Sequence, residues 1–201
     1  MGIKGKMSNK TKENRGLIGN ELPHNFVNRK VYRSNSLNLE EQEKLLSVVE
    51  TFEDLALFTL ELNSGIRRED ISRVDIGNLD LENRTLKFWE SKKNRWWTIP
   101  LTQEVVMTLT RYLNSIPKGQ RKLFTFTGRT AYNKLQHYLK KAEIRKSIAF
   151  HDLRRTFIKT AKKKGLSPKA VSQITGDTMR TIQEHYENLD IEELKEEVDK
   201  L

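Results

Sequence analysis

The chain has 201 residues, of which 36% are hydrophobic, so it is long enough to bury the core of one large domain. It contains no cysteine, which excludes disulfides and thiolate chemistry, and its four histidines lack the spacing of metal ligands. We therefore expect neither a metal nor a cofactor. No apolar run approaches the length that a bilayer requires, and no secretory leader is apparent, so we expect a cytoplasmic protein that does not bind membranes.

The charge is unevenly distributed along the chain. Lysine and arginine total 37 against 27 aspartate and glutamate, a formal net charge of +10. Most of the excess lies between Lys140 and Lys169, whereas the residues after Tyr186 are mainly acidic. This pattern indicates a basic surface for double-stranded DNA and an acidic tail for another protein surface, although general solubility explains the charge excess equally well.

The first part of the chain predicts an arm and then two helices. Residues 1–36 are polar, basic and aperiodic, so we predict a flexible arm or linker, followed by one domain over 37–201. Asn38 and Glu41 have the spacing of a capping box and predict the start of a helix. A second helix from Phe52 is predicted to end at Gly65.

The middle of the chain changes from helical periodicity to alternation. From Ile76 to Leu101 the pattern predicts three short strands, separated by the turn-like "ENR" and "SKKN". The remainder predicts helices, including one capped by Ser167 with Pro168 at its first position, and an acidic amphipathic helix over 190–201. The expected fold class is α+β, mostly helical, with a small three-stranded antiparallel sheet.

Five residues in this pattern could carry chemistry. His151 and Arg154 in "HDLRRTF" lie three residues apart on one helix face and can reach a single ligand, although a buried histidine beside a surface arginine is the more ordinary interpretation. Arg67 follows a helix-ending glycine, and Lys92 lies at the tip of the predicted hairpin. Tyr186 has the helical spacing of a core residue.

Taken in order, these residues resemble the catalytic set of the tyrosine recombinases, the phage integrase family. The matching motifs are "SGIRREDI", "ESKKNRWWTIPL", "HDLRRTF" and "ITGDTMRTIQEHY", and the resemblance extends from about Leu37 to the end of the chain. It implies the catalytic domain of a site-specific DNA recombinase or integrase. Such an enzyme cuts and rejoins DNA strands by transesterification through a 3′-phosphotyrosine intermediate, without a metal.

The resemblance also implies a role for each residue. Tyr186 would be the nucleophile. Arg67 and Arg154 would hold the scissile phosphate, because a permanently charged planar guanidinium is a strong partner for phosphate oxygens. Lys92 would protonate the leaving 5′-hydroxyl, and His151 would assist proton transfer near the tyrosine. Cations around the phenol would make Tyr186 reactive at neutral pH.

Asp177 stands where the family usually has histidine or tryptophan, so we count it with the catalytic set. Three roles are open for it: a protonated donor to the phosphate, a partner of a catalytic cation, or a cap for the helix beginning at Thr178. Asp70, three residues after the first arginine, is expected to buttress Arg67.

Further contacts with DNA and with a second protomer are expected. The predicted DNA-binding residues are Lys93, Arg95, Arg155 and Lys159, with a salt bridge as the alternative for Arg155. By resemblance, the acidic helix over 190–201 would dock on a neighbouring protomer in a homo-oligomer on DNA, a tetramer in the synapse, associated with the nucleoid. Residues 1–36 are too short to be the family's usual N-terminal core-binding domain, so we expect a catalytic fragment or a minimal member.

Two other functions are compatible with the sequence. "SPKAVSQITGDTMRTIQEHY" has the helix, glycine turn and helix of a helix-turn-helix reader, so the chain could be a DNA-binding regulator or an inactive recombinase relative. A type IB topoisomerase would use the same phosphotyrosine chemistry without strand exchange. Assays for covalent DNA adducts and for strand exchange distinguish these functions.

Overall fold

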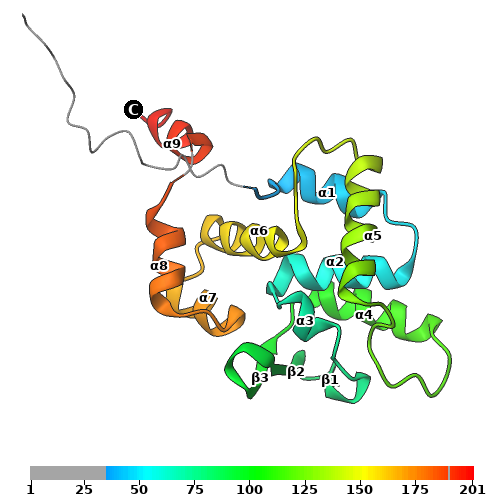
Figure 1. The fold of residues 1–201 in the computed structure, drawn as a ribbon. Coiled ribbons are helices and arrows are strands. Elements are labelled where there is room, and N and C mark those ends of the chain that lie inside the picture. The colour runs from blue at the N-terminus through cyan, green and yellow to red at the C-terminus, as the bar shows by residue number, and fades with distance from the viewer. Residues whose placement is uncertain (1–34, 190) are drawn as a thin grey trace, which may run out of the picture. The chain divides into compact units, whose positions relative to one another are not determined.

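The structure is a computed structural model that describes residues 35–189 and 191–201 (Figure 1). Apart from Asn35 and Ser36, the arm predicted over 1–36 lies outside the described residues. The elements in chain order are α1 (Leu39–Ser47), α2 (Phe52–Ser64), α3 (Arg68–Ile71), η2 (Ile76–Asn78), β1 (Leu79–Asp80), β2 (Thr85–Glu90), η3 (Ser91–Lys93), β3 (Arg95–Pro100), α4 (Gln103–Ser115), α5 (Gly128–Lys141), α6 (Phe150–Lys163), α7 (Pro168–Thr175), α8 (Met179–Glu187) and α9 (Ile191–Val198).

Local capping chemistry explains where several helices begin and end. The Asn38 side chain accepts a hydrogen bond from Glu41 N at 2.8 Å, and the Glu41 carboxylate accepts one from Asn38 N, which confirms the predicted capping box. Ser167 caps α7, and Pro168 occupies its first turn, as predicted. Gly65 ends α2 and Gly176 ends α7, each in the left-handed conformation that glycine adopts most readily.

The sheet confirms the predicted fold class. Its three strands are antiparallel in the order β1-β2-β3, and the register of β2 with β3 runs from Thr85 opposite Pro100 to Glu90 opposite Arg95. Side chains alternate along β2, so Leu86, Phe88 and Glu90 are buried on the face toward the core. The opposite face is more accessible to solvent.

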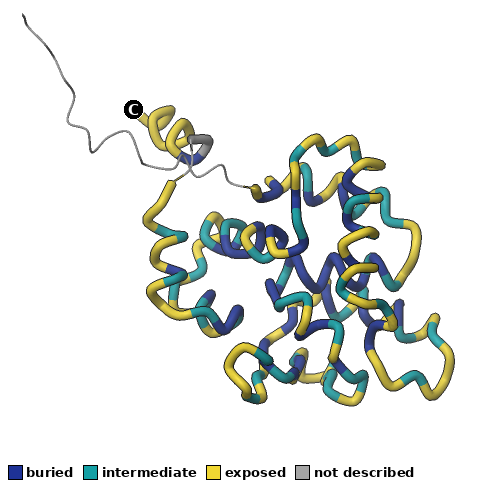
Figure 2. The backbone as a smooth tube through the Cα atoms, viewed as in Figure 1, coloured by how far each residue is buried: buried dark blue, intermediate teal, exposed yellow. Residues whose placement is uncertain are grey.

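Two groups of buried apolar residues hold the helices. The larger group centres on α2, where Leu57, Phe58 and Leu60 are fully buried, and α2 is the most continuously buried helix in Figure 2. The smaller group joins α6, α7 and α8 and consists of Phe157, Ile158, Ala161, Val171 and Ile182. Among the described helices, none has the length and apolar composition needed to cross a membrane.

Candidate active site

The end of α2 brings Arg67 beside α6. A Cβ atom added to Gly65 would lie 3.0 Å from Phe157 Cδ1 and 3.2 Å from Arg154 Cγ, and φ at this position is +59°. Glycine therefore allows both the tight turn and the close approach to α6. Arg67 follows two residues later with an extended backbone, directly before α3. The predicted pairing of Arg67 with Arg154, which lie far apart in the sequence, thus has a structural basis in this turn.

Asp177 bridges the two arginines. Its Oδ1 lies 2.8 Å from Arg67 Nη2, and its Oδ2 lies 2.7 Å from Arg154 Nη2 and 3.1 Å from Arg154 Nε. The side chains of Arg67 and Arg154 are 20% and 12% exposed, so this clamp is shielded but reachable from solvent. Two guanidinium groups that each hold one oxygen of the same anion form a bidentate anion site.

This arrangement decides among the roles expected for Asp177. The carboxylate pairs with both arginines of the predicted catalytic set, which was one of the three alternatives. The cap of α8 is instead Thr178, whose hydroxyl accepts a hydrogen bond from Thr181 N at 3.2 Å. The capping role for Asp177 is therefore wrong.

Glu90 is a second carboxylate of the clamp that the sequence motifs did not single out. It is 1% exposed and accepts hydrogen bonds from Arg67 Nη1 and Arg95 Nε, both at 2.8 Å. A Cβ atom on Gly176 would lie 2.8 Å from Glu90 Oε1, so the α7–α8 turn packs directly on this carboxylate. The alternation of β2 does predict that Glu90 faces the core, and a core-facing glutamate needs a cationic partner.

Asp70 does not buttress Arg67 as expected. Its Oδ1 accepts a hydrogen bond from Ser91 N at 3.0 Å, and its other oxygen is buried without a hydrogen-bond partner. Because Glu90 and Asp177 already occupy the Arg67 guanidinium, Asp70 anchors the first residue of the hairpin turn instead. It positions the loop that carries Lys92.

A cavity brings three of the predicted residues together. Arg67, His151 and Arg154 line it, with Glu61 and Tyr132 on its wall. The His151 side chain is 68% exposed, and its Nε2 lies 3.2 Å from Asp152 Oδ1. Glu61 is 1% exposed, and its Oε2 is buried without a hydrogen-bond partner. Burial raises the pKa of Glu61 well above 4.5, with the Arg154 charge opposing the shift.

The hairpin does not place all its cations as the motifs predicted. Lys92 is exposed at the tip, whereas Lys93 donates a hydrogen bond to the Gly176 carbonyl. The Arg95 guanidinium pairs with Glu90 and lies 3.8 Å above the centre of the Trp97 ring. Lys93 and Arg95, predicted as DNA contacts, are therefore occupied within the protein.

The other two predicted DNA contacts also have protein partners. Arg155 pairs with Asp152 at 3.1 Å, which is the salt bridge kept as its alternative. Lys159 lies 3.8 Å from Glu193 of α9. The acidic partner is buried in each pair, so Arg155 and Lys159 are held by carboxylates of the protein itself.

Tyr186 lies apart from the clamp in this structure. Its hydroxyl donates a hydrogen bond to the Leu166 carbonyl at 2.7 Å, and its ring packs on the smaller apolar group. Burial raises the pKa of Tyr186 above 10.0. Here the hydroxyl is bonded to a backbone carbonyl, and activation of the phenol by surrounding cations stays a prediction. The phenol is protonated, and its hydroxyl is directed at Leu166 rather than at the clamp.

The motifs did not single out His185, the residue before Tyr186 in α8. Burial lowers its pKa below 6.5, followed in size by the effect of the Arg155 charge, while the charge of Asp177 acts in the opposite direction. Among the described residues, no three His, Asp or Glu side chains cluster as metal ligands would.

Comparisons with known proteins identify the family. Residues 35–193 match the model of the phage integrase family. Tyrosine recombinase XerA of Saccharolobus solfataricus is 26% identical over 155 residues, which cover 77% of this chain and 52% of that protein. The crystal structure of XerA recombinase superposes with a TM-score of 0.72 at 23% identity, covering 82% of this chain and 62% of that one.

A DNA complex has a similar fold. The structure of XerH site-specific recombinase bound to a difH substrate, in a pre-cleavage complex, matches with a TM-score of 0.66 at 20% identity and covers 80% of this chain and 52% of that one. This chain thus spans about half the length of XerA from S. solfataricus and of XerH. The family match covers most of the chain, so the resemblance seen in the motifs is confirmed: the chain belongs to the phage integrase family.

Proposed function

We propose that this chain is the catalytic domain, over residues 37–201, of a site-specific recombinase that cuts and rejoins duplex DNA. The observation that carries the proposal is the Asp177 carboxylate held between Arg67 and Arg154. A phosphodiester also presents two charged oxygens on one centre. The clamp therefore has the chemistry to hold a scissile phosphate after Asp177 gives way.

Each group would then act on that phosphate. Arg67 and Arg154 stabilise the charge that grows on the non-bridging oxygens in the transition state. The Tyr186 oxygen attacks phosphorus and forms a 3′-phosphotyrosyl bond as the bond to the 5′-oxygen breaks. Lys92, on the exposed turn, delivers a proton to that oxygen. His151, on the cavity wall, takes part in proton transfer at the tyrosine.

Tyr186 has to move before it can react. Its hydroxyl is bonded to Leu166 O, and the helix that carries it rests on a small apolar group, so a shift of α8 disturbs few buried contacts. Displacing Asp177 from the arginines acts on the turn that begins this same helix. Phosphate binding at the clamp and repositioning of the nucleophile would therefore be coupled through the 177–179 turn.

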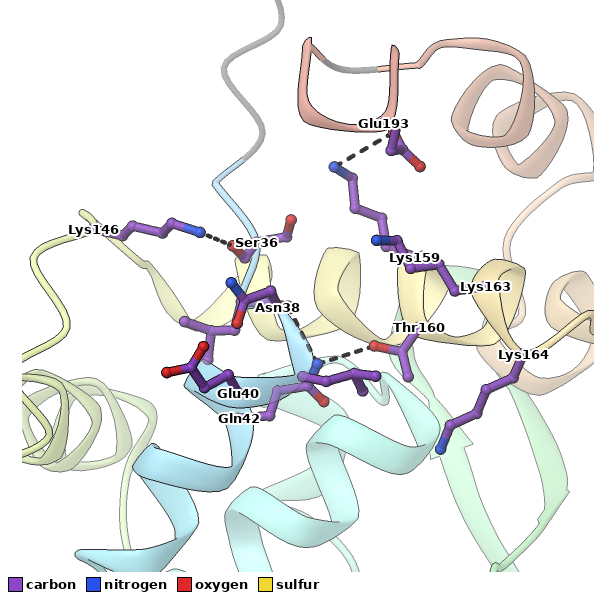
Figure 3. A pocket seen from close by; sticks show the side chains of 12 residues that line it. Ser36, Asn38, Glu40, Gln42, Lys146, Lys159, Thr160, Lys163, Lys164 and Glu193 are labelled. Carbon is purple, nitrogen blue, oxygen red and sulfur yellow. Dashed lines mark hydrogen bonds and ion pairs between the residues drawn. The ribbon is translucent and has the colours of Figure 1, made fainter. Parts of the chain in front are cut away.

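The acidic helix α9 would contact both its own chain and a second copy. Glu193 of α9 lies 3.2 Å from Lys162 of α6, and Figure 3 shows Glu193 directed toward Lys159. Leu194 and Val198 remain 44% and 61% exposed. We infer that this apolar edge packs on a second copy of the chain, in a tetramer on two DNA sites, because an amphipathic helix is stabilised by burying such an edge.

An inactive relative that binds DNA without cutting it is the second candidate. Two contacts favour this candidate: Asp177 fills the anion site, and the Tyr186 hydroxyl is bonded to Leu166 O. An active recombinase would have to break both contacts before it cuts DNA. A type IB topoisomerase is the third, and it would relax DNA without exchanging strands between two duplexes.

A trapping assay separates these functions. The protein is incubated in EDTA with nicked suicide substrates of candidate sites, from which the released strand diffuses away and leaves the intermediate covalently bound. We expect a covalent protein–DNA species that maps to Tyr186 and is absent from Tyr186→Phe, while that variant binds the same DNA with nearly unchanged affinity. DNA binding without any adduct would favour the inactive relative, and an adduct at Tyr32, Tyr112, Tyr132 or Tyr138 would contradict the assignment of the nucleophile.

A further inference from the structure

The outer face of the hairpin presents a pair of tryptophans. Trp89 of β2 and Trp96 of β3 are cross-strand partners, with ring centroids 5.6 Å apart and planes at 77°. Trp96 is 54% exposed, and Lys87 Nζ lies 5.3 Å from the centre of its ring. The two rings pack edge to face and stabilise the hairpin, yet about half of the Trp96 surface stays uncovered beside a cation. Neither ring takes part in the clamp.

The two tryptophans lie close to the turn that carries Lys92. Trp89 and Trp96 precede the last residue pair of the hairpin, Glu90 with Arg95, so they lie close to the turn that carries Lys92. The chain turns between the two strands through η3 (Ser91–Lys93), so Lys92 comes three residues after Trp89 and four before Trp96. If Lys92 reaches the leaving oxygen, the tryptophans stand beside the bases that flank the cut.

The charges around the hairpin also favour a polyanion. Lys87 is exposed beside Trp96, and Lys92 is exposed at the turn. Arg73 donates a hydrogen bond to the Ser91 hydroxyl at 2.7 Å, which adds a third cation at the base of the turn. The two carboxylates next to the turn are both buried: Glu90 pairs with arginines, and Asp70 accepts a hydrogen bond from Ser91 N. This surface therefore attracts a nucleic acid more strongly than an acidic or apolar protein.

We propose that the Trp89–Trp96 pair is a stacking platform for an unpaired nucleobase beside the cleavage point. The inference rests on the proposed function, because cutting a strand is what frees flanking bases from their stack. Indole faces bind bases of any sequence by stacking, and a neighbouring lysine holds the adjoining phosphate. The platform would hold a base out of the duplex while strands are exchanged.

The experiment compares two DNAs that differ only in pairing. One is a short duplex, and the other is the same duplex with a small unpaired bubble, with Kd measured by fluorescence anisotropy for the full chain. We expect the parent to prefer the bubble and Trp96→Leu to lose that preference by roughly tenfold, with little change in affinity for the intact duplex. Trp96→Phe should retain most of the preference because it keeps an aromatic face.

A matched control tests whether the effect belongs to the aromatic pair. Phe52 on α2 is 53% exposed, so Phe52→Leu removes an equally accessible ring from another element and should leave both affinities unchanged. Equal weakening on both DNAs by Trp96→Leu, or no weakening on either, would overturn the platform. A change from oligomer to monomer in Trp96→Leu, with DNA affinities unchanged, would overturn it in favour of a protein contact. If the parent binds neither DNA, the proposed function itself is wrong.

Discussion

The arginine clamp and the tyrosine helix are built in different ways. Arg67 and Arg154 extend from elements that pack on the large core around α2, and each makes ion pairs with carboxylates at 2.7–2.8 Å. The helix that carries Tyr186 rests on five buried residues, of which it contributes only Ile182. The anion site is therefore preformed, while Tyr186, the proposed nucleophile, lies on a helix whose only buried residue is Ile182. We therefore expect the clamp to bind DNA before Tyr186 is in position to react.

The largest effects should come from breaking the clamp. Arg154→Lys keeps one positive charge but loses the fork that holds Asp177, the Gly65 carbonyl and the Thr175 carbonyl. We expect the rate of covalent adduct formation to fall about 10²–10³-fold, as is typical when one donor to a developing oxyanion is removed. Arg155→Lys, one residue away on the same helix, is the matched control. A loss below tenfold in Arg154→Lys, measured by single-turnover trapping, would place the phosphate elsewhere.

Substitutions of Asp177 sharpen the comparison because this residue joins the two regions. A carboxylate about 4 Å from a phosphate would cost on the order of 4 kcal/mol at an effective dielectric constant near 20 if both remained charged. We expect Asp177→Asn to cleave at least as fast as the parent, by up to about tenfold, and Asp177→His to be faster still. Asp177→Ala should be slower, since the bridge between the two arginines is lost and each keeps only its separate partners.

Each possible result with the three Asp177 variants indicates a different role for this residue. A folded but inactive Asn variant would mean that the ionised carboxylate is required. Equal rates for all three variants would mean that Asp177 stands outside the chemistry. Thermal unfolding of each variant, measured in parallel, separates catalytic effects from loss of structure.

The sequence predicted the supports of the clamp better than its contacts. The capping box at Asn38, the glycine at position 65 and the alternation over β2 are local signals, and each appears in the fold where expected. The bridge from Asp177 to two arginines depends on elements about 110 and 23 residues away, which no local pattern encodes. The contact of Lys93 with the Gly176 carbonyl likewise joins residues far apart in the sequence.

Tyr186 illustrates a different limit. Its helical spacing is that of a core residue, and the family motif makes it a nucleophile. Both statements fit this structure, because the ring packs on the smaller apolar group while the hydroxyl is bonded to Leu166 O. The hydrogen bond to Leu166 O joins Tyr186 to a residue 20 positions earlier, which neither the helical spacing nor the motif encodes.

A smaller effect concerns Glu61 and pH. The folded-state pKa of Glu61 is raised by burial, so the folded protein holds a proton that the unfolded chain releases above about 4.5. Stability from this site is therefore complete below that pH and is lost as pH rises toward the folded pKa. We expect Glu61→Gln to raise Tm relative to the parent at pH 8 and to leave it nearly unchanged at pH 4. An equal shift at both pH values would indicate a packing effect rather than ionisation.

The smallest effect on the fold should come from removing residues 190–201. The pair of Glu196 with Lys163 is exposed and contributes at most about 1 kcal/mol, whereas the pair of Glu193 with Lys162 is partly buried. We expect a folded protein that still binds a single DNA site, with steep salt dependence, but that binds paired sites without cooperativity. Electrophoretic mobility shifts on one-site and two-site DNA measure this. Unchanged cooperativity would mean that α9 packs only on its own chain.

Hydrogen–deuterium exchange with and without DNA tests most directly whether the clamp is preformed and the tyrosine helix is the part that moves. Backbone amides of α2 and α6, whose ends carry the clamp, should exchange slowly in the free protein and change little when DNA binds. Amides of α8, from Met179 to Glu187, should exchange faster in the free protein and change markedly on DNA. If α6 exchanges as fast as α8 without DNA, the clamp is not preformed. If the exchange of α8 is unchanged in a complex that forms the adduct, the tyrosine helix is not the part that moves.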